Sequence, residues 1–179
     1  DTQDDITQAV PVGVAGVGRY LPERRLPNRD LEAMVDTSNE WIMQRTGIAE
    51  RRIAADDENC STLGVHAARA ALADAGIDGK DLDLILCCTV TGDQPFPATA
   101  CRIGADLGAT HAGGFDITAA CSGFLYGMQV GAQFVASGAG KNVLVVGAEV
   151  LSRILDYKDR NTCVLFGDGA GAVVLTSLE

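Results

Sequence analysis

The sequence has few basic residues and no long apolar run. Lys and Arg total 14 of 179 residues, against 24 Asp and Glu, so the formal net charge is −10. An acidic chain binds nucleic acid and anionic membranes poorly, because both of these carry negative charge. No apolar run approaches the roughly 20 residues that a membrane-spanning helix needs. We therefore expect neither a nucleic-acid partner nor a membrane partner.

Metal-ligating patterns are also missing. The chain has only two histidines, His66 and His111, and its six cysteines form no C-x-x-C pair. We therefore expect no metal and no bound cofactor. The polar start, Asp1 to Gln8, lacks the basic-then-apolar layout of a signal peptide. Without an export signal, the thiols are expected to stay reduced in the cytoplasm.

The apolar segments follow a pattern that is typical of an α/β protein, in which strands alternate with helices. Hydrophobic residues make up 47% of the chain and charged residues 21%, as in an ordinary globular domain. Nearly continuous apolar runs such as Leu82–Val90 are typical of strands buried on both faces. Strands that alternate with helices predict a parallel sheet, here with one antiparallel strand late in the chain. We expect a flexible leader at residues 1–11 and one layered α/β domain over residues 12–179.

The expected elements follow from apolar spacing and from capping residues. Asn28 is expected to cap the first helix, and Gly76 to end the third. Before the second helix stand three capping types, Thr37, Ser38 and Asn39, and Gly47 is expected to end it. A tight turn at Gly167–Gly169 is expected between the last two strands, after a charged loop at residues 153–161. The expected strands span residues 12–17, 82–90, 114–117, 142–146, 164–166 and 170–175, and the expected helices span residues 31–35, 40–45, 61–75, 97–107 and 121–137.

Cys121 differs from the other five cysteines in its position. It follows an expected strand that ends at Ile117, across the small residues 118–120, and it begins an expected helix. A thiol at a helix N-terminus meets unpaired N–H groups and the positive end of the helix dipole, which both favour the thiolate. Sites in open α/β sheets also lie at the carboxyl ends of strands. The pattern leaves two interpretations open: a catalytic nucleophile, or a structural cysteine that packs as a small apolar residue.

The segment from Asp116 to Phe124, DITAACSGF, resembles the active-site segment of the β-ketoacyl-acyl-carrier-protein synthase III family. Further blocks that resemble the family occur in the same order, and the resemblance spans residues 12–175. It implies the amino-terminal half of a thiolase-like fold, with a mostly parallel five-stranded sheet and helices on both faces. The further blocks are GVGRYLP at 16–22, VDTSNEWI at 35–42, RTGI at 45–48, FP at 96–97 and FGDGAG at 166–171.

The resemblance also implies an activity. Enzymes of this family condense an acyl-CoA primer, commonly acetyl-CoA, with malonyl-acyl-carrier protein, and the malonyl group loses CO2. This reaction starts type II fatty-acid synthesis, and it would pass through an acyl-Cys121 intermediate. The implied partners are acyl-CoA, malonyl-acyl-carrier protein and a second copy of the chain in a homodimer.

The family's binding residues have counterparts here. Trp41 resembles the indole that stacks on the CoA adenine, and Arg160 matches the arginine on the other face of that base. Arg45 and Thr37 match contacts to the nucleotide and the pantetheine arm, and Phe96 resembles the aromatic that shapes the acyl pocket across the dimer. Without the resemblance, each would be read as an ordinary core, surface or helix-staple residue.

The family also uses a His and an Asn from its second half, and no motif here matches them. We expect the C-terminal half of the same enzyme to supply both, and this chain alone to be inactive. The Gly-rich run at residues 167–171 lacks the Lys and the spacing of a phosphate-binding loop. Three alternatives stay open: a related condensing enzyme of secondary metabolism, a hydroxymethylglutaryl-CoA synthase, or a non-catalytic half that acts as a dimerisation or scaffold module.

Overall fold

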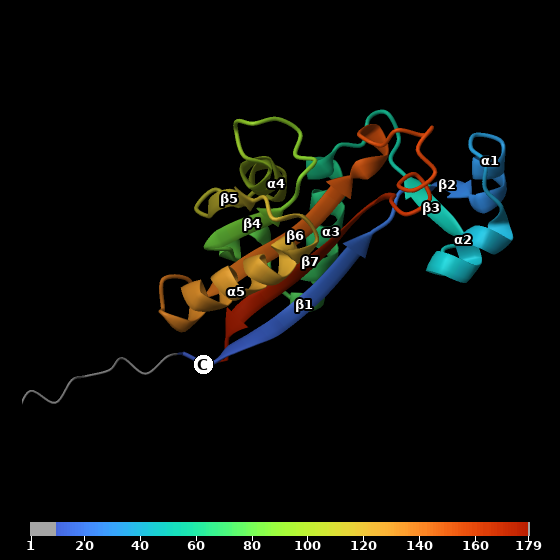
Figure 1. The fold of residues 1–179 in the computed structure, drawn as a ribbon. Helices are drawn as coiled ribbons and strands as arrows, with labels where there is room; N and C mark the ends of the chain where they lie inside the picture. The colour runs from blue at the N-terminus through green and yellow to red at the C-terminus, as the bar shows by residue number, and fades with distance from the viewer. Residues whose placement is uncertain (1–9, 179) are drawn as a thin grey trace, which may run out of the picture.

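A computed structural model gives the structure of residues 10–178. Most of the leader expected at residues 1–11 lies outside these described residues. Within them, the Val10 N–H donates to the Ala136 carbonyl oxygen at 3.0 Å, and the Leu178 N–H donates to the Pro11 carbonyl oxygen at 3.0 Å. The two ends of the described chain therefore lie side by side (Figure 1).

Five strands form the main sheet, in the order β1–β7–β6–β4–β5 (Figure 1). They are β1 (Val12–Tyr20), β4 (Leu84–Cys88), β5 (Gly113–Ile117), β6 (Asn142–Val150) and β7 (Asp168–Ser177). β4 pairs in parallel with β5 and β6, whereas β7 is antiparallel to β1 and β6. Four of the five strands therefore share one direction. The expected mostly parallel sheet with one late antiparallel strand is confirmed.

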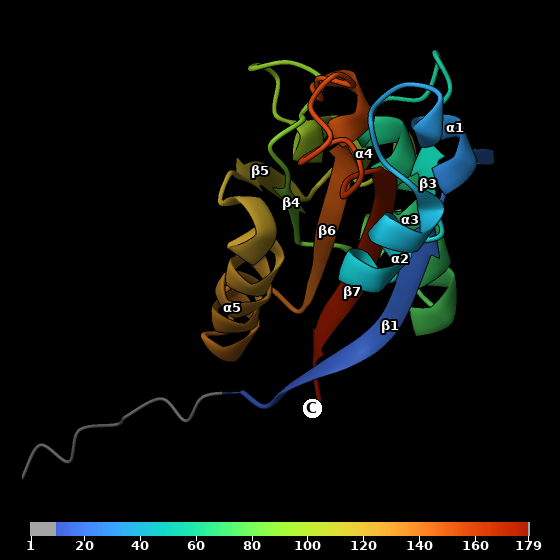
Figure 2. The same cartoon turned by 45° about the vertical axis from the view of Figure 1, so that its right-hand side comes forward.

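Helices cover both faces of this sheet, as expected. The helices α3 (Cys60–Ala75) and α4 (Thr99–Leu107) pack on one face, and α5 (Gly123–Ala136) packs on the other (Figure 2). In β4, Ile85 and Cys87 enter the core under α3, whereas Leu86 and Cys88 enter the core under α5. Because both faces are buried, the strand has no polar positions, and its sequence reads as one apolar run.

Glycines bring α5 unusually close to the sheet. Gly123, Gly127 and Gly131 recur every four residues, and all three are buried on one side of the helix. A Cβ atom on Gly131 would lie 3.0 Å from Leu175, and a Cβ atom on Gly127 would overlap the Sγ atom of Cys88. The small residues thus fix the height of α5 above the sheet, and with it the position of the residues that begin the helix.

A second, smaller unit lies beyond the end of the main sheet, and the sequence patterns did not predict its strands. It contains the antiparallel pair β2 (Arg24–Pro27) and β3 (Glu50–Ile53), with α1 (Asn28–Glu32) and α2 (Asn39–Thr46) (Figure 1). We call this unit, residues 24–53, the lobe. Its core joins Leu31 and Ile42 to Cys163 and Val164, which come from the segment before β7.

The helix boundaries agree with the expected caps in most places. Ser38 caps α2 by accepting from the Trp41 N–H at 3.1 Å, and Gly47 ends α2 with a φ of 72°. Gly76 ends α3 with a φ of 69°. Asn28 is not a cap, however. It is the buried first residue of α1. Its side-chain amide does not cap the helix and instead donates to the Ile48 carbonyl oxygen at 2.8 Å.

The expected strand at residues 164–166 is wrong. The Leu165 N–H donates to the Thr162 carbonyl oxygen at 3.0 Å, which closes a turn, and Val164 is buried in the lobe instead of in a sheet. The expected tight turn at Gly167–Gly169 is also wrong, since β7 begins at Asp168. The Asp168 carboxylate accepts from the Ala54 N–H at 2.7 Å, and so it joins the start of β7 to the end of β3.

Candidate active site

Cys121 lies between the carboxyl end of β5 and the start of α5, as the pattern predicted. The expected continuous helix from Cys121 to Ser137 is instead a short 3-10 turn, Ala120–Ser122, followed by α5. Ala120 has a φ of 46°, in the left-handed region that a residue with a Cβ rarely adopts. Cys121 itself is exposed.

A pocket of about 320 Å³ adjoins Cys121. It is bounded by the 3-10 turn, the first turn of α5 and the carboxyl ends of β4 and β6. Its walls are mainly apolar, with one carboxylate. The lining residues are Cys88, Val90, Ala120, Cys121, Phe124, Gly147, Ala148, Glu149, Leu151 and Phe166.

The second thiol of this pocket is a poor nucleophile. Cys88 is 5% exposed, and burial raises the pKa of its thiol to about 11, although a hydrogen bond from the Gly127 backbone opposes the shift. Cys60, Cys87 and Cys163 are buried as well, whereas Cys101 is exposed on α4 and does not line the pocket. Cys121 is therefore the exposed thiol that borders the pocket.

Glu149 is the carboxylate of the pocket, and the sequence patterns missed it. It accepts from the Val90 N–H at 2.9 Å and from the hydroxyl groups of Thr89 and Thr91. The Thr91 hydroxyl also accepts from the Val150 N–H at 2.8 Å. Glu149 thus joins the carboxyl ends of β4 and β6. The signal that could have found it is a single charged residue at the end of an otherwise apolar strand.

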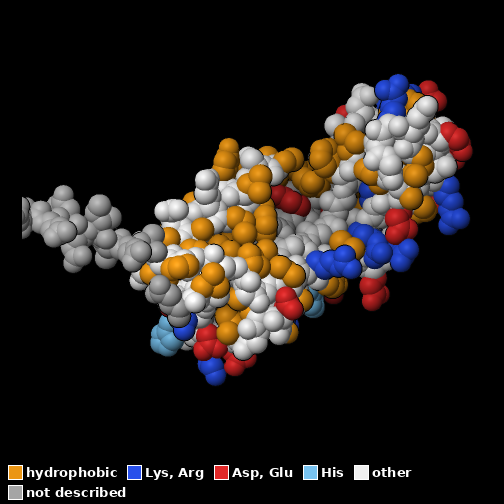
Figure 3. Space-filling view, turned by 90° about the horizontal axis from the view of Figure 1, so that it is seen from below, with side chains coloured by type: hydrophobic (Ala, Val, Ile, Leu, Met, Phe, Trp, Pro, Cys, Tyr) orange, Lys and Arg blue, Asp and Glu red, His pale blue; other side chains and the backbone are white. Residues whose placement is uncertain are grey.

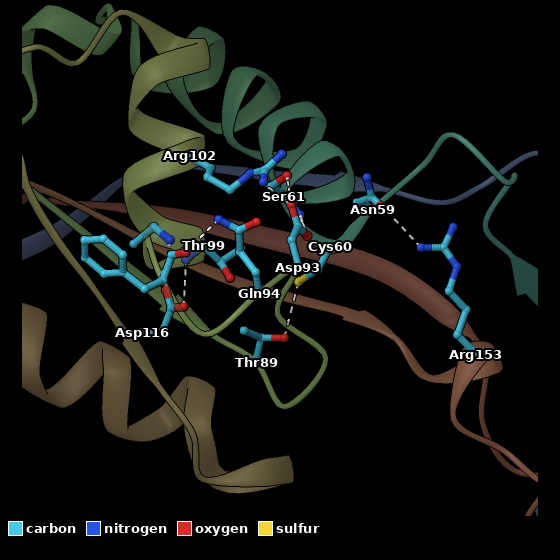
Figure 4. A network of polar contacts seen from close by, with 12 residues as sticks. Asn59, Cys60, Ser61, Thr89, Asp93, Gln94, Thr99, Arg102, Asp116 and Arg153 are labelled. Atoms are coloured by element: carbon cyan, nitrogen blue, oxygen red, sulfur yellow. Dashed lines mark hydrogen bonds and ion pairs between the residues drawn. The ribbon is translucent and has the colours of Figure 1, made fainter.

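The loop between β4 and α4 carries Phe96 and is held at both ends by carboxylates (Figure 4). Asp93 accepts from the Ser61 N–H at 3.0 Å and pairs with Arg102 at 3.1 Å. Asp116 accepts from the first two N–H groups of α4, at 2.7 and 2.8 Å. Between these anchors Phe96 is 87% exposed. A large apolar side chain so exposed is available to a partner.

Trp41 and Arg160, far apart in the sequence, meet at the surface of the lobe. The Cζ atom of Arg160 lies 4.6 Å from the centroid of the Trp41 ring, and the Cζ atom of Arg45 lies 5.2 Å from it. Both distances fall within the range of cation–π contacts. The structure therefore brings together three of the residues predicted to bind CoA.

Thr37 lies next to Asp36, which contacts Arg160. The Arg160 side chain donates to the Asp36 carbonyl oxygen at 2.9 Å and lies 3.8 Å from the exposed Asp36 carboxylate. The Thr37 hydroxyl oxygen is buried and has no hydrogen-bond partner within residues 10–178. A buried hydroxyl without a partner is costly, so this group is suited to a polar ligand.

Comparison with known proteins shows which family the chain resembles. Residues 115–179 match the family model described as 3-oxoacyl-[acyl-carrier-protein (ACP)] synthase III. The chain is 61% identical over 163 residues to the beta-ketoacyl-[acyl-carrier-protein] synthase III of Geobacillus kaustophilus, which covers 91% of this chain and 53% of the relative. This chain is similar to synthase III proteins over about half of their length. The Bacillus anthracis synthase III 1 is 58% identical over 168 residues, covering 94% of this chain and 54% of the relative.

Solved structures of synthase III proteins share the fold. The 3-oxoacyl-[acyl-carrier-protein] synthase III from Aquifex aeolicus superposes with a TM-score of 0.92 at 51% identity, over 94% of this chain and 55% of that one. The priming β-ketosynthase from the R1128 polyketide biosynthetic pathway also has a TM-score of 0.92, at 42% identity, over 95% of this chain and 51% of that one. The chain thus has the fold of a synthase III, and it spans about half the length of the relatives it matches.

Three further features bear on the expected partners and compartment. Within residues 10–178, no group of three or more His, Cys, Asp or Glu side chains is placed to hold a metal ion. Over the same residues, no helix is both long and apolar enough to cross a membrane. All six cysteines are free thiols.

Proposed function

We propose that this chain carries the nucleophile of an acyltransferase that condenses an acyl-CoA primer, acetyl-CoA in the first instance, with malonyl-acyl-carrier protein. The observation that carries this proposal is the exposed Cys121 thiol at the edge of a largely apolar pocket of about 320 Å³, at the carboxyl end of β5. The Cys121 thiolate attacks the thioester carbonyl of the primer, and the CoA thiolate leaves. The acyl group is then held on Cys121 as a new thioester.

The second half-reaction forms a carbon–carbon bond. The malonyl group loses CO2, and the electron pair of the broken bond attacks the acyl carbonyl carbon on Cys121. The Cys121 thiolate leaves, which releases a 3-ketoacyl-carrier protein. The backbone N–H of Cys121 is one proposed donor to the oxyanion that forms on the acyl group. The family's His and Asn would stabilise the enolate.

Neither histidine of this chain is suited to that role. His66 stacks on Tyr20 with ring centroids 4.4 Å apart, in a separate pocket, and His111 does not line the pocket of Cys121. We propose that the His and Asn come from the C-terminal half of the same enzyme, outside the present sequence. This chain alone is then inactive.

The proposed CoA site consists of Trp41, Arg45, Thr37 and Arg160. An adenine between Trp41 and Arg160 needs two contact distances of about 3.5 Å each. Since the Arg160 Cζ atom is 4.6 Å from the ring centroid, the guanidinium must move outward when the base enters. The buried Thr37 hydroxyl without a partner supports a polar ligand at this place.

We also propose a homodimer in the cytoplasm. Hydrophobic side chains gather over the main body next to its amino-terminal end, whereas charged side chains gather on the lobe (Figure 3). Val14 and Val17 on β1 and Leu125 and Tyr126 on α5 are exposed, as is Phe96. Such apolar surface supports both a dimer contact and a contact with the second half of the enzyme. The free thiols are compatible with a reducing compartment.

A product assay tests the function. The complete gene product is supplied with acetyl-CoA and either malonyl-acyl-carrier protein or acetoacetyl-CoA, and the products are identified by mass spectrometry. A 3-ketoacyl-carrier protein is the expected product. Hydroxymethylglutaryl-CoA as the product would favour that synthase instead. The absence of any product would favour the scaffold module.

The second candidate is a priming ketosynthase of secondary metabolism. It is favoured by the equal TM-score of the R1128 enzyme, although the sequence identity to that enzyme is lower. Both candidates use the same half-reactions, so the choice of primer separates them. A clear preference for primers longer than acetyl-CoA would favour the secondary-metabolic enzyme.

A further inference from the structure

Arg51, on β3, is buried inside the lobe although its guanidinium carries a charge. The residue is 3% exposed, and no carboxylate within residues 10–178 forms an ion pair with it. Its partners are neutral. Nε and one terminal nitrogen donate to the Val164 carbonyl oxygen at 3.0 and 2.6 Å, and the other terminal nitrogen donates to the Asn28 side-chain oxygen at 2.5 Å. Removing one partner of such a buried charge is costly.

The contacts of Arg51 extend into both helices of the lobe. The Asn28 amide nitrogen donates to the Ile48 carbonyl oxygen at 2.8 Å and to the Asn39 side-chain oxygen at 3.0 Å. The Asn39 N–H, at the start of α2, donates to the Glu32 carboxylate at 2.6 Å. One network, which is buried at Arg51 and Asn28, therefore joins α1, α2 and β3 to the segment before β7.

This network lies between the two sides of the nucleotide site. Trp41 belongs to α2, whereas Arg160 belongs to the segment of residues 154–167, which also carries Val164. The direct polar contacts of Arg160 with the lobe go to Asp36, at the surface, and exposed contacts of this kind contribute little. The buried polar link between the segment and the lobe is the pair of bonds from Arg51 to Val164.

We propose that Arg51 is a positioning residue for acyl-CoA. By holding the Val164 carbonyl group and Asn28 together, it sets the distance at which Arg160 faces Trp41, and so it sets the affinity for the nucleotide without touching it. This inference rests on the proposed function, because it assumes that Trp41 and Arg160 bind the CoA adenine.

The test compares Arg51→Lys with Arg52→Lys in the complete gene product. Lysine keeps the charge but lacks the fork that reaches Val164 and Asn28 at once. Arg52 is the matched control, since it lies on the same strand and its contacts go to the Pro22 carbonyl oxygen at 2.9 Å and to Glu50 at 3.5 Å. CoA affinity is measured by calorimetry, and KM is measured separately for acetyl-CoA and for malonyl-acyl-carrier protein.

Arg51→Lys is expected to weaken CoA binding and to raise KM for acetyl-CoA by about tenfold, a change of about 1.4 kcal/mol. The KM for malonyl-acyl-carrier protein and kcat should stay within about twofold, as should every constant of Arg52→Lys. A purely structural role for Arg51 would instead lower the unfolding temperature and the fraction of active enzyme, and leave both KM values unchanged. That result would overturn the proposal.

A second variant keeps the test decisive if Arg51→Lys does not fold. Asn28→Ser removes the acceptor that orients one terminal nitrogen of Arg51 and keeps the bonds to Val164. It should weaken CoA binding in the same direction but by less, and unchanged CoA binding would overturn the proposal. Failure of the underlying function would look different, because the wild-type protein would then bind no CoA, or Trp41→Ala would bind it as well as the wild type.

Discussion

The Sγ atom of Cys88 occupies the space that a Cβ atom on Gly127 would need. Gly123, one turn earlier in the helix, has more space. A Cβ atom added there would lie at an ordinary 3.6 Å from the Cys88 Cβ atom. The contact between Cys88 and Gly127 therefore sets how closely α5 approaches β4. Since the 3-10 turn of Cys121 leads directly into α5, the same contact places the Cys121 thiol.

Gly127→Ala should destabilise the fold and slow the acylation of Cys121. Overpacking a buried contact costs about 1–3 kcal/mol, which exceeds the gain of about 1 kcal/mol in helix propensity. Chemical denaturation measures the loss. Cys88→Ala should restore much of the stability in the double variant, because it removes the clashing sulfur. Equal losses with and without Cys88→Ala would show that the contact does not limit the packing.

The stability of the protein should fall at high pH because of Cys88. Burial raises the pKa of this thiol to about 11, so the folded state holds its proton more tightly than the unfolded state does. The contribution is complete below the ordinary thiol pKa of about 8.5, and it is lost as pH rises toward 11. The contribution of the Cys88 thiol to the free energy of unfolding amounts to about 3 kcal/mol.

The measurement is the unfolding free energy of the wild type minus that of Cys88→Ala, taken at several pH values between about pH 8 and pH 11. A shift of one pKa unit corresponds to about 1.4 kcal/mol in this difference. Other titrating groups, such as Tyr20, cancel in this difference. The difference should decrease steadily as the pH rises. A constant difference would mean that Cys88 does not titrate differently in the folded state.

Trp41→Ala should raise the KM for acyl-CoA about fivefold, since it removes stacking and cation–π contacts worth on the order of 1 kcal/mol. The KM for malonyl-acyl-carrier protein should not change. Trp41→Phe is the matched control, because it keeps an aromatic face and should show a smaller effect. Equal changes in both KM values would indicate that Trp41 has only a structural role.

Phe96→Asp should weaken self-association. The side chain is 87% exposed in a loop that carboxylates hold at both ends, so the substitution leaves the fold intact and places a charge at the proposed dimer contact. Light scattering on the purified protein measures the change in mass. Met34→Asp, at a residue 51% exposed on the lobe, is the control and should not change the mass. A wild-type protein that is already monomeric would contradict the homodimer.

The sequence predicted the parts of the fold that depend on local patterns. The buried strand β4, the ends of α2 and α3 at Gly47 and Gly76, and the position of Cys121 between β5 and α5 follow from apolar runs and capping residues. The pair β2–β3 was missed because its strands are short and polar, and therefore lack the expected alternation. These strands are stabilised by the lobe around them.

Long-range polar contacts account for the remaining errors. The residue types at 164–166, which favour β-structure, predict a strand. However, the Val164 carbonyl oxygen accepts hydrogen bonds from Arg51, and the Val164 side chain enters the lobe core. Glu149 was also missed: its local signal is only a single charge at the end of an apolar strand, and its role depends on the threonines that follow β4. Contacts between residues so far apart in the chain leave no trace in local spacing.

The acylation of Cys121 is the most direct test of the account. The complete gene product is mixed with acetyl-CoA without the second substrate, quenched in acid and mapped by peptide mass spectrometry. The acetyl group should appear on the Cys121 peptide, be absent from Cys121→Ala and remain in Cys101→Ala, which removes the other exposed thiol. Acetylation of a different cysteine, or undiminished acetylation and turnover in Cys121→Ala, would contradict the assignment of the nucleophile.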